Sequence, residues 1–193
     1  MNLVHSPLVA PPKLKSLAES KYPDDLGQNE RKVGHMITYM DAIIGKFLDK
    51  VEELDLEENT LIIFTGDNGT YVKVISELNG SKYPGGKGST RDNGTHVPLV
   101  ASWPGTAPAG KVSDALVDFS DILPTLAELG GAELPAKLNY EGLSLAPLLQ
   151  GKAFKGRESI YCWYHRNGLR GKESQHTRTS DFKLYATGRY FKV

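Results

Sequence analysis

The stretch "TLIIFTGDNGT", residues 60–70, places a short apolar run directly before an acidic and an amide side chain. Leu61 to Thr65 is too short for a helix and rich in strand-favouring residues, so it predicts a strand buried on both faces, as in a parallel sheet. Asp67 and Asn68 follow at its carboxyl end, where α/β proteins bind ligands. Their oxygens suit calcium or magnesium. Asp-Asn-Gly is also ordinary turn chemistry, and these residues alone favour that simpler interpretation.

A long amphipathic helix is predicted before this strand, from about Asn29 to Leu54. Asn29 is a plausible N-cap, with Glu30 in the first turn. A helix, a short loop, an apolar strand and a polar turn in this order are typical of an α/β protein. The apolar stripe recurs at spacings of three and four residues: Val33, Met36, Ile37, Met40, Ile43, Ile44, Phe47, Leu48, Val51 and Leu54.

Residues 66–95 hold seven glycines and few apolar anchors, which predicts a long loop. Within it, Gly85-Gly86-Lys87-Gly88 allows close backbone approach around one ammonium group, which can bind a tetrahedral oxyanion. A solvated surface lysine is the simpler interpretation of Lys87. His5, near the chain start, has a side chain suited to proton transfer near neutral pH, but nothing local requires that role.

The second half of the chain predicts a further buried strand, a helix and a β-rich end. Residues 97–102 form the strand, and Ser120 is the expected N-cap of the helix that Gly130-Gly131 ends. Leu123, Leu126 and Leu129 of this helix are expected to face the core. From about residue 157 the sequence predicts antiparallel strands with a turn at Gly188.

Composition excludes several classes of protein. Lys plus Arg and Asp plus Glu number 23 each in 193 residues, so no basic excess indicates nucleic-acid binding. The single cysteine, Cys162, excludes an intrachain disulfide and a cysteine-based zinc site. No stretch approaches the roughly 18–20 apolar residues that span a bilayer, so no membrane partner is expected.

Taken in order, these segments resemble the sulfatase family, within the alkaline-phosphatase superfamily. The resemblance rests on segments spread over nearly the whole chain: "MITYMDAIIGKFLDKVEELDLEENTLIIFTGDNG", "GGKGSTRDNGTHVPLVASWPG", "VDFSDILPTLAELGG", "HSPLVAPP" and "RTSDFKLYATG". It implies a mixed, largely parallel sheet flanked by helices. It also implies two parts: residues 1–156 from the catalytic α/β domain and residues 157–193 from a small antiparallel C-terminal subdomain.

The resemblance also implies roles for four residues. Asp67 and Asn68 match the second half of the family's calcium site, where Mg²⁺ is also possible. Lys87 matches the lysine that contacts the substrate sulfate, and His5 matches the histidine on the leaving-group side. A sulfate ester in such a pocket has its developing negative charge stabilised by fixed cations.

Two family features are missing from the sequence. The early acidic pair of the calcium site and the Cys/Ser-x-Pro/Ala-x-Arg motif, which gives the formylglycine nucleophile, do not precede His5. Cys162 and Arg166 have the motif's spacing, but Tyr164 stands where proline belongs. We therefore expect the C-terminal part of a sulfatase, cut at both ends and inactive alone, with weak calcium binding because calcium takes roughly 6–8 oxygens.

Two alternatives remain open at this point. The chain could belong to another hydrolase of the superfamily, a phosphatase or a phosphonate-ester hydrolase. It could instead be a non-catalytic α/β domain that binds an anion or a partner, with its exposed sheet edge covered by dimerisation.

Overall fold

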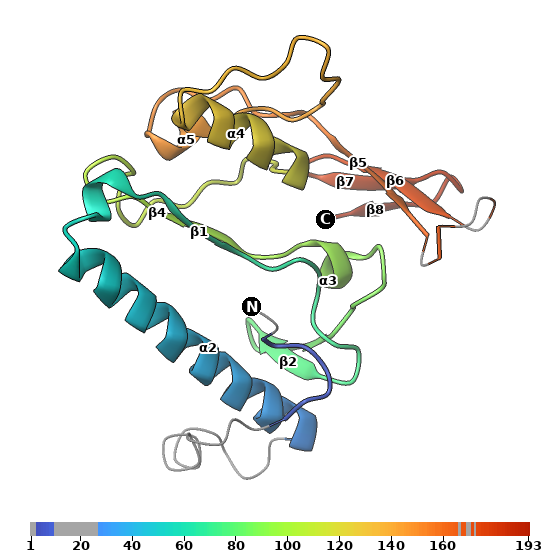
Figure 1. The fold of residues 1–193 in the computed structure, drawn as a ribbon. Coiled ribbons are helices and arrows are strands. Elements are labelled where there is room, and N and C mark those ends of the chain that lie inside the picture. The colour runs from blue at the N-terminus through green and yellow to red at the C-terminus, as the bar shows by residue number, and fades with distance from the viewer. Residues whose placement is uncertain (1–2, 10–26, 166, 169–170, 172) are drawn as a thin grey trace. The chain divides into compact units, whose positions relative to one another are not determined.

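The chain forms two compact units, Met1–Val100 and Ala101–Val193, in a computed structural model (Figure 1). Both units contain helices and strands, as the predicted α/β class requires. The structure describes residues 3–9, 27–165, 167–168, 171 and 173–193.

The predicted long helix is confirmed as α2, Gln28–Glu53. Its predicted N-cap is wrong, because Gly27 occupies that position and makes no side-chain cap. The Asn29 side chain instead donates to the Lys73 carbonyl at 3.3 Å, and Glu30 Oε1 accepts from the Ile75 amide at 2.8 Å. The first turn of α2 is therefore attached to a distant segment rather than capped locally.

The predicted apolar strands are present as β1, Ile62–Thr65, and β4, Leu99–Ser102, which pair with each other. The short 3₁₀ turn η1, Glu57–Asn59, precedes β1. The prediction that β1 and β4 are buried strands is wrong. β1 is half-buried, and Val100 in β4 is 57% exposed. Among the described residues this sheet has two strands, so neither strand is flanked by a second neighbour.

The predicted loop over residues 66–95 is wrong in part, since it contains a hairpin and a helical turn. β2, Ile75–Leu78, pairs antiparallel with β3, Ser81–Pro84, and α3 covers Asp92–Thr95. The connecting residues Asn79 and Gly80 have φ angles of 52° and 75°, as a two-residue type I′ turn requires. The Asn-Gly pair was the sequence signal for this hairpin. It was missed because both strands are exposed and carry no apolar face.

The first helical segment of the second unit is the 3₁₀ turn η2, Phe119–Asp121, which leads into α4, Ile122–Leu129. The short α5 is Ala146–Leu149. The predicted cap Ser120 is wrong, because Asp118 accepts from the Ser120 amide at 2.9 Å.

The predicted inward face of α4 is also wrong. Leu123 and Leu126 are 50% and 53% exposed and Leu129 is half-buried, while Pro124 and Thr125 are buried. The Thr125 hydroxyl donates to the Asp121 carbonyl and accepts from the Leu145 amide at 2.8 Å, and these bonds turn that face of α4 inward.

The predicted end of α4 is confirmed. Gly131 has a φ of 67°, and the amides of Gly131 and Ala132 donate to the carbonyls of Glu128 and Ala127. This is the Schellman arrangement, in which glycine takes the left-handed position.

The β-rich end forms a four-stranded antiparallel sheet in the order β5-β6-β7-β8, with the predicted turn at Gly188, whose φ is 82°. The register sets Cys162 opposite His176 and His176 opposite Tyr185. His176 and Lys183 on this face are buried, so polar groups form part of its packing. The boundary at residue 157 stays a prediction. The strands are Ile160–Tyr164, Ser174–Arg178, Phe182–Tyr185 and Tyr190–Lys192.

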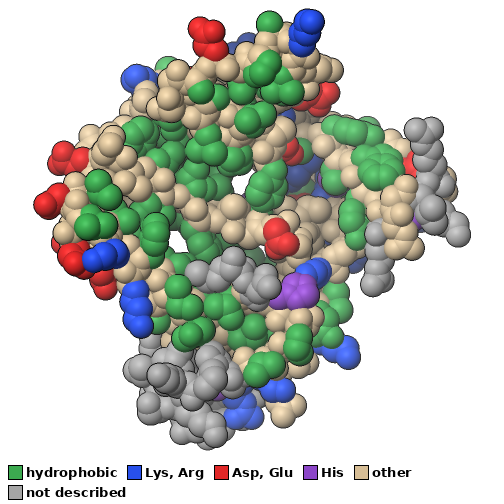
Figure 2. All heavy atoms as spheres, viewed as in Figure 1, with side chains coloured by type: hydrophobic (Ala, Val, Ile, Leu, Met, Phe, Trp, Pro, Cys, Tyr) green, Lys and Arg blue, Asp and Glu red, His purple; other side chains and the backbone are tan. Residues whose placement is uncertain are grey.

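Few apolar side chains are fully buried in the described part of the chain. Hydrophobic side chains cover much of the face seen in Figure 2. The stripe of α2 is buried at Val33, Met36 and Val51 but exposed at Phe47, by 57%, and at Leu54. Within the described residues, no helix has the length and apolar character needed to cross a bilayer.

Candidate functional site

The Asp67–Asn68 pair lies in a bend directly after β1. Gly66 separates the strand from the pair, and the Gly69 amide then donates to the Gly94 carbonyl at 2.9 Å. Asp67 is exposed and Asn68 is half-buried. A carboxylate and an amide oxygen therefore stand next to each other at the end of a strand.

Lys87 lies in a turn that follows β3. Its side chain is half-buried, and Gly88, directly after it, has a φ of 82°, which favours glycine. The Lys87 amide donates to the Thr70 carbonyl at 2.9 Å. This bond joins the Lys87 turn to the segment that holds Asp67 and Asn68.

Glycines allow the Lys87 turn and α3 to approach the 67–70 segment closely. A Cβ at Gly85 would lie 2.7 Å from the Thr70 oxygen, and a Cβ at Gly69 would lie 2.7 Å from the Gly94 Cα. Neither approach is possible for a larger residue without a shift of backbone. The structure thus brings the 67–70 segment, the 85–88 segment and α3 together, which sequence reasoning expected for Asp67, Asn68 and Lys87 but not for α3.

His5 is exposed, and its Nδ1 donates to the Ser6 carbonyl at 2.6 Å. That bond is to its own neighbour and leaves Nε2 as the nitrogen able to reach a ligand. The role of His5 stays a prediction.

The donor set fits part of a calcium site. Asp67 and Asn68 offer hard oxygens, the type that calcium and magnesium prefer. In the described part of the chain no three His, Cys, Asp or Glu side chains gather as a metal cluster. The pair could therefore hold one side of an ion, with the other oxygens supplied by water or by further groups.

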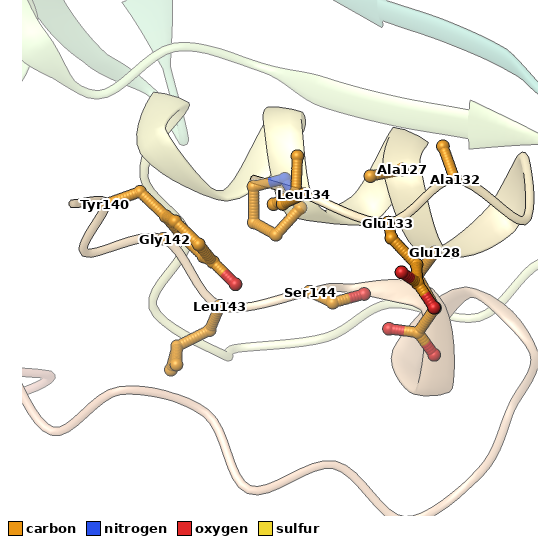
Figure 3. A pocket seen from close by; sticks show the side chains of 10 residues that line it. Ala127, Glu128, Ala132, Glu133, Leu134, Tyr140, Gly142, Leu143 and Ser144 are labelled. Atoms are coloured by element: carbon orange, nitrogen blue, oxygen red, sulfur yellow. The ribbon is translucent and has the colours of Figure 1, made fainter. Parts of the chain in front are cut away.

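A pocket of about 580 Å³ lies in the second unit, beside α4 (Figure 3). The carboxylates of Glu128 and Glu133 stand at one end of it and the Tyr140 ring at the other. Its walls are otherwise mainly apolar, including Pro124 and Leu143. Negative charge disfavours a sulfate group here, so this pocket does not duplicate the chemistry of Lys87.

Two polar groups of evident structural importance were missed by sequence reasoning. Asn93, in α3, donates from Nδ2 to the Pro84 carbonyl at 3.0 Å. Asp121 is 1% exposed and paired with Arg157. The Asn93-Gly94 pair was a visible signal, whereas two partners of Asp121, Leu143 and Arg157, lie more than 20 residues away in sequence.

Comparison with known proteins assigns the family. The sulfatase family model matches residues 2–132, and the model described as N-sulphoglucosamine sulphohydrolase, C-terminal, matches residues 87–192. Human steryl-sulfatase is 35% identical over 157 residues, covering 76% of this chain and 27% of that protein. Mouse arylsulfatase G is 34% identical over 201 residues, covering 96% of this chain and 35% of that protein.

Solved structures agree with this assignment. The crystal structure of Ps i-CgsB superimposes with a TM-score of 0.80 at 27% identity, covering all of this chain and 42% of that one. The α/β fold, with its small antiparallel sheet at the C-terminus, is thus the alkaline-phosphatase-like fold of sulfatases. The chain spans about a quarter to a third of the curated relatives it matches. By its sequence and its fold, the chain is a member of the sulfatase family.

Proposed function

We propose that this chain supplies part of the active site of a sulfuric ester hydrolase. Asp67 and Asn68 would bind one side of a calcium ion, Lys87 would bind the sulfate, and His5 would act on the leaving-group side. The observation that carries the proposal is the direct hydrogen bond between the Lys87 turn and the Asp67–Thr70 segment. It supports the proposal because it joins the turn that carries Lys87 to the segment that carries Asp67 and Asn68.

The charges suit an anionic ester. When bound, calcium supplies positive charge to the sulfate oxygens. The Lys87 ammonium adds a second positive group, and its half-buried position strengthens its attraction for an anion relative to a fully exposed lysine. His5, with Nδ1 committed to Ser6, would exchange a proton through Nε2.

Turnover by this chain alone is not expected. The 193 residues contain no Cys/Ser-x-Pro/Ala-x-Arg motif, so the formylglycine nucleophile would have to come from elsewhere in a longer protein. With p-nitrophenyl sulfate, we expect no hydrolysis above buffer. Saturable turnover that disappears in Lys87→Ala would contradict this part of the proposal.

Binding provides the direct test. The ¹⁵N-labelled chain is titrated with calcium chloride and, with calcium present, with sodium methyl sulfate as a soluble sulfate ester. We expect roughly millimolar calcium binding, since the Asp67–Asn68 pair falls short of a full ligand set. Amide shifts should be confined to residues 66–70 and 85–94.

Matched variants identify the ligands. Asp67→Ala should abolish the calcium-induced shifts, and Lys87→Ala should weaken methyl sulfate binding roughly tenfold through loss of a charged hydrogen bond. The controls are Asp49→Ala on the exposed face of α2 and Lys82→Ala in β3. Equal effects of Lys82→Ala and Lys87→Ala would overturn the assignment of Lys87.

The substrate and the assembly are narrower proposals. The sulfate ester is the proposed substrate, and p-nitrophenyl phosphate run beside p-nitrophenyl sulfate in a longer, active form would test the phosphatase alternative. Dimerisation through an exposed sheet edge is proposed as well, and gel filtration over a range of concentrations tests it.

A further inference from the structure

The Asn93 side chain holds the point at which the β2–β3 hairpin leads into the Lys87 turn. Its Nδ2 donates to the carbonyl of Pro84, the last residue of β3, at 3.0 Å. The next amide, of Gly85, donates to the Val74 carbonyl at 2.8 Å. Both bonds fix the chain two to three residues before Lys87.

Gly86 gives Asn93 the room to pack there. A Cβ at Gly86 would lie 2.7 Å from the Asn93 carbonyl carbon and closer still to the Asn93 side-chain amide. Real Cβ atoms do not approach other atoms so closely, so any other residue at position 86 would displace Asn93. The Asn93 Oδ1 is buried at this contact.

The backbone beside Asn93 meets the other half of the candidate site. A Cβ at Gly69 would lie 2.8 Å from the Asn93 carbonyl carbon, and the Gly69 amide donates to the Gly94 carbonyl at 2.9 Å. Residues 93–94 therefore contact both the turn before Lys87 and the turn after Asp67–Asn68. The Lys87–Thr70 hydrogen bond and the close approach of Gly85 to the Thr70 oxygen link the same turns directly.

We propose that Asn93 is a positioning residue that sets the separation of the Lys87 ammonium from the Asp67–Asn68 oxygens. This inference rests on the proposed function. Asn93 acts through the backbone of Pro84 and Gly86 and does not itself bind the ester. A sulfate group that is bound by a cation and an ammonium together requires a fixed distance between the two. A glycine-rich loop keeps such a distance only if further contacts hold it, and we call the contacts of Asn93 with Pro84 and Gly86 the Asn93 clamp.

Amide hydrogen exchange tests the clamp without any ligand. In Asn93→Ala, exchange should accelerate about fivefold at the amides of Lys87 and Gly69, as expected for loss of one hydrogen bond. The matched control is Asn29→Ala, which removes the same kind of bond, from a side-chain amide to the Lys73 carbonyl, in the same unit. That control should leave both amides unchanged, as should amides of β5 and β6 in either variant.

Methyl sulfate binding tests the positioning. In Asn93→Ala, the calcium-induced shifts at Asp67 and Asn68 should persist, while the dissociation constant for methyl sulfate rises roughly threefold to tenfold. Gly86→Ala should reproduce this selective loss, because its Cβ displaces the Asn93 amide. If Asn93 only stabilised the fold, its substitution would weaken the binding of calcium and of methyl sulfate together.

The outcomes separate the two proposals. If amide exchange at Lys87 and Gly69 is unchanged in Asn93→Ala, the clamp is overturned, regardless of the binding results. If exchange accelerates but methyl sulfate binding is unchanged, the positioning role is overturned. A wild-type chain that binds neither calcium nor methyl sulfate overturns the proposed function and, with it, the positioning role. The exchange result then shows separately whether Asn93 holds the two turns together.

Discussion

Asp121 shows how one buried carboxylate organises the second unit. Its Oδ2 accepts from the Asp118 amide at 2.8 Å, and its Oδ1 accepts from the Leu143 amide at 2.7 Å and from Arg157. The Arg157 side chain is 14% exposed, so the ion pair is shielded from water. Three segments far apart in sequence are joined by a single side chain.

We expect Asp121→Ala to destabilise the second unit by about 3–5 kcal/mol, because it leaves the Arg157 charge and two amides without their acceptor. Urea unfolding followed by circular dichroism measures this change. The control is Asp114→Ala, at an exposed position of the same unit, which should stay within about 0.5 kcal/mol of the wild type. Equal effects of the two substitutions would show that the Asp121 network contributes little.

The Cys162 thiol provides a pH-dependent test. Burial raises the pKa of this thiol above its ordinary value, Lys183 opposes that change, and Asp118 adds to it. The folded chain therefore holds the thiol proton more tightly than the unfolded chain does. Stability should fall as pH rises through the window between the ordinary and the raised pKa.

Alkylation measures this shift. The rate of reaction with iodoacetamide should rise with pH around a higher midpoint in the folded chain than in the chain unfolded by urea, since the thiolate is the reactive form. A shared midpoint in the two states would contradict the raised pKa.

At the scale of elements, the close approach of the 66–70 turn to α3 predicts contrasting effects of two glycine substitutions. Gly69→Ala should destabilise the chain by about 1–3 kcal/mol, because its Cβ would lie 2.7 Å from the Gly94 Cα. Gly45→Ala, in α2 with nothing within 4 Å of its Cβ, should stabilise it by about 0.5–1 kcal/mol. Thermal unfolding of both variants tests the pair, and a stable Gly69→Ala would argue against the tight packing.

Elements with strong local patterns could be predicted from the sequence, and those that depend on partners could not. The spacing of apolar residues located α2, and the short apolar run located β1, because periodicity is a property of neighbouring residues. The caps of α2 and of the η2–α4 segment were misplaced. Asn29 bonds to Lys73, and Asp118 rather than Ser120 makes the cap, and both outcomes follow from the path of the chain beyond the helix.

In the candidate site, too, the sequence identified individual residues but not the contacts that bring them together. Asp67, Asn68 and Lys87 were selected by sequence and resemblance, and their roles stay predictions. Their proximity depends on backbone bonds between segments about 20 residues apart, such as that from Lys87 to Thr70. The Asn93-Gly94 pair was visible in the sequence as a turn signal, but the proposed positioning role of Asn93 was not, since it depends on packing against Gly86 and Gly69.

At the scale of the whole molecule, the amount of exposed apolar surface predicts weak cooperativity. Few large apolar side chains are fully buried in the described residues, while Phe47, Val100, Tyr161 and others are more than half exposed. We expect the chain to bind the dye ANS and to unfold with an m-value below that of a compact protein of equal length, since m follows the surface exposed on unfolding. An m-value equal to that of a compact protein of the same length, together with no ANS binding, would contradict this expectation.

The sequence by itself determined the family, the α/β class and the position of α2, β1 and the antiparallel end, because these depend on local periodicity and on short motifs in order. Only the tertiary structure decided which faces are buried, which residues cap the helices and how the Lys87 turn meets the Asp67–Asn68 turn. Those features depend on hydrogen bonds and close contacts between segments distant in sequence, and no local pattern encodes the partner of such a contact.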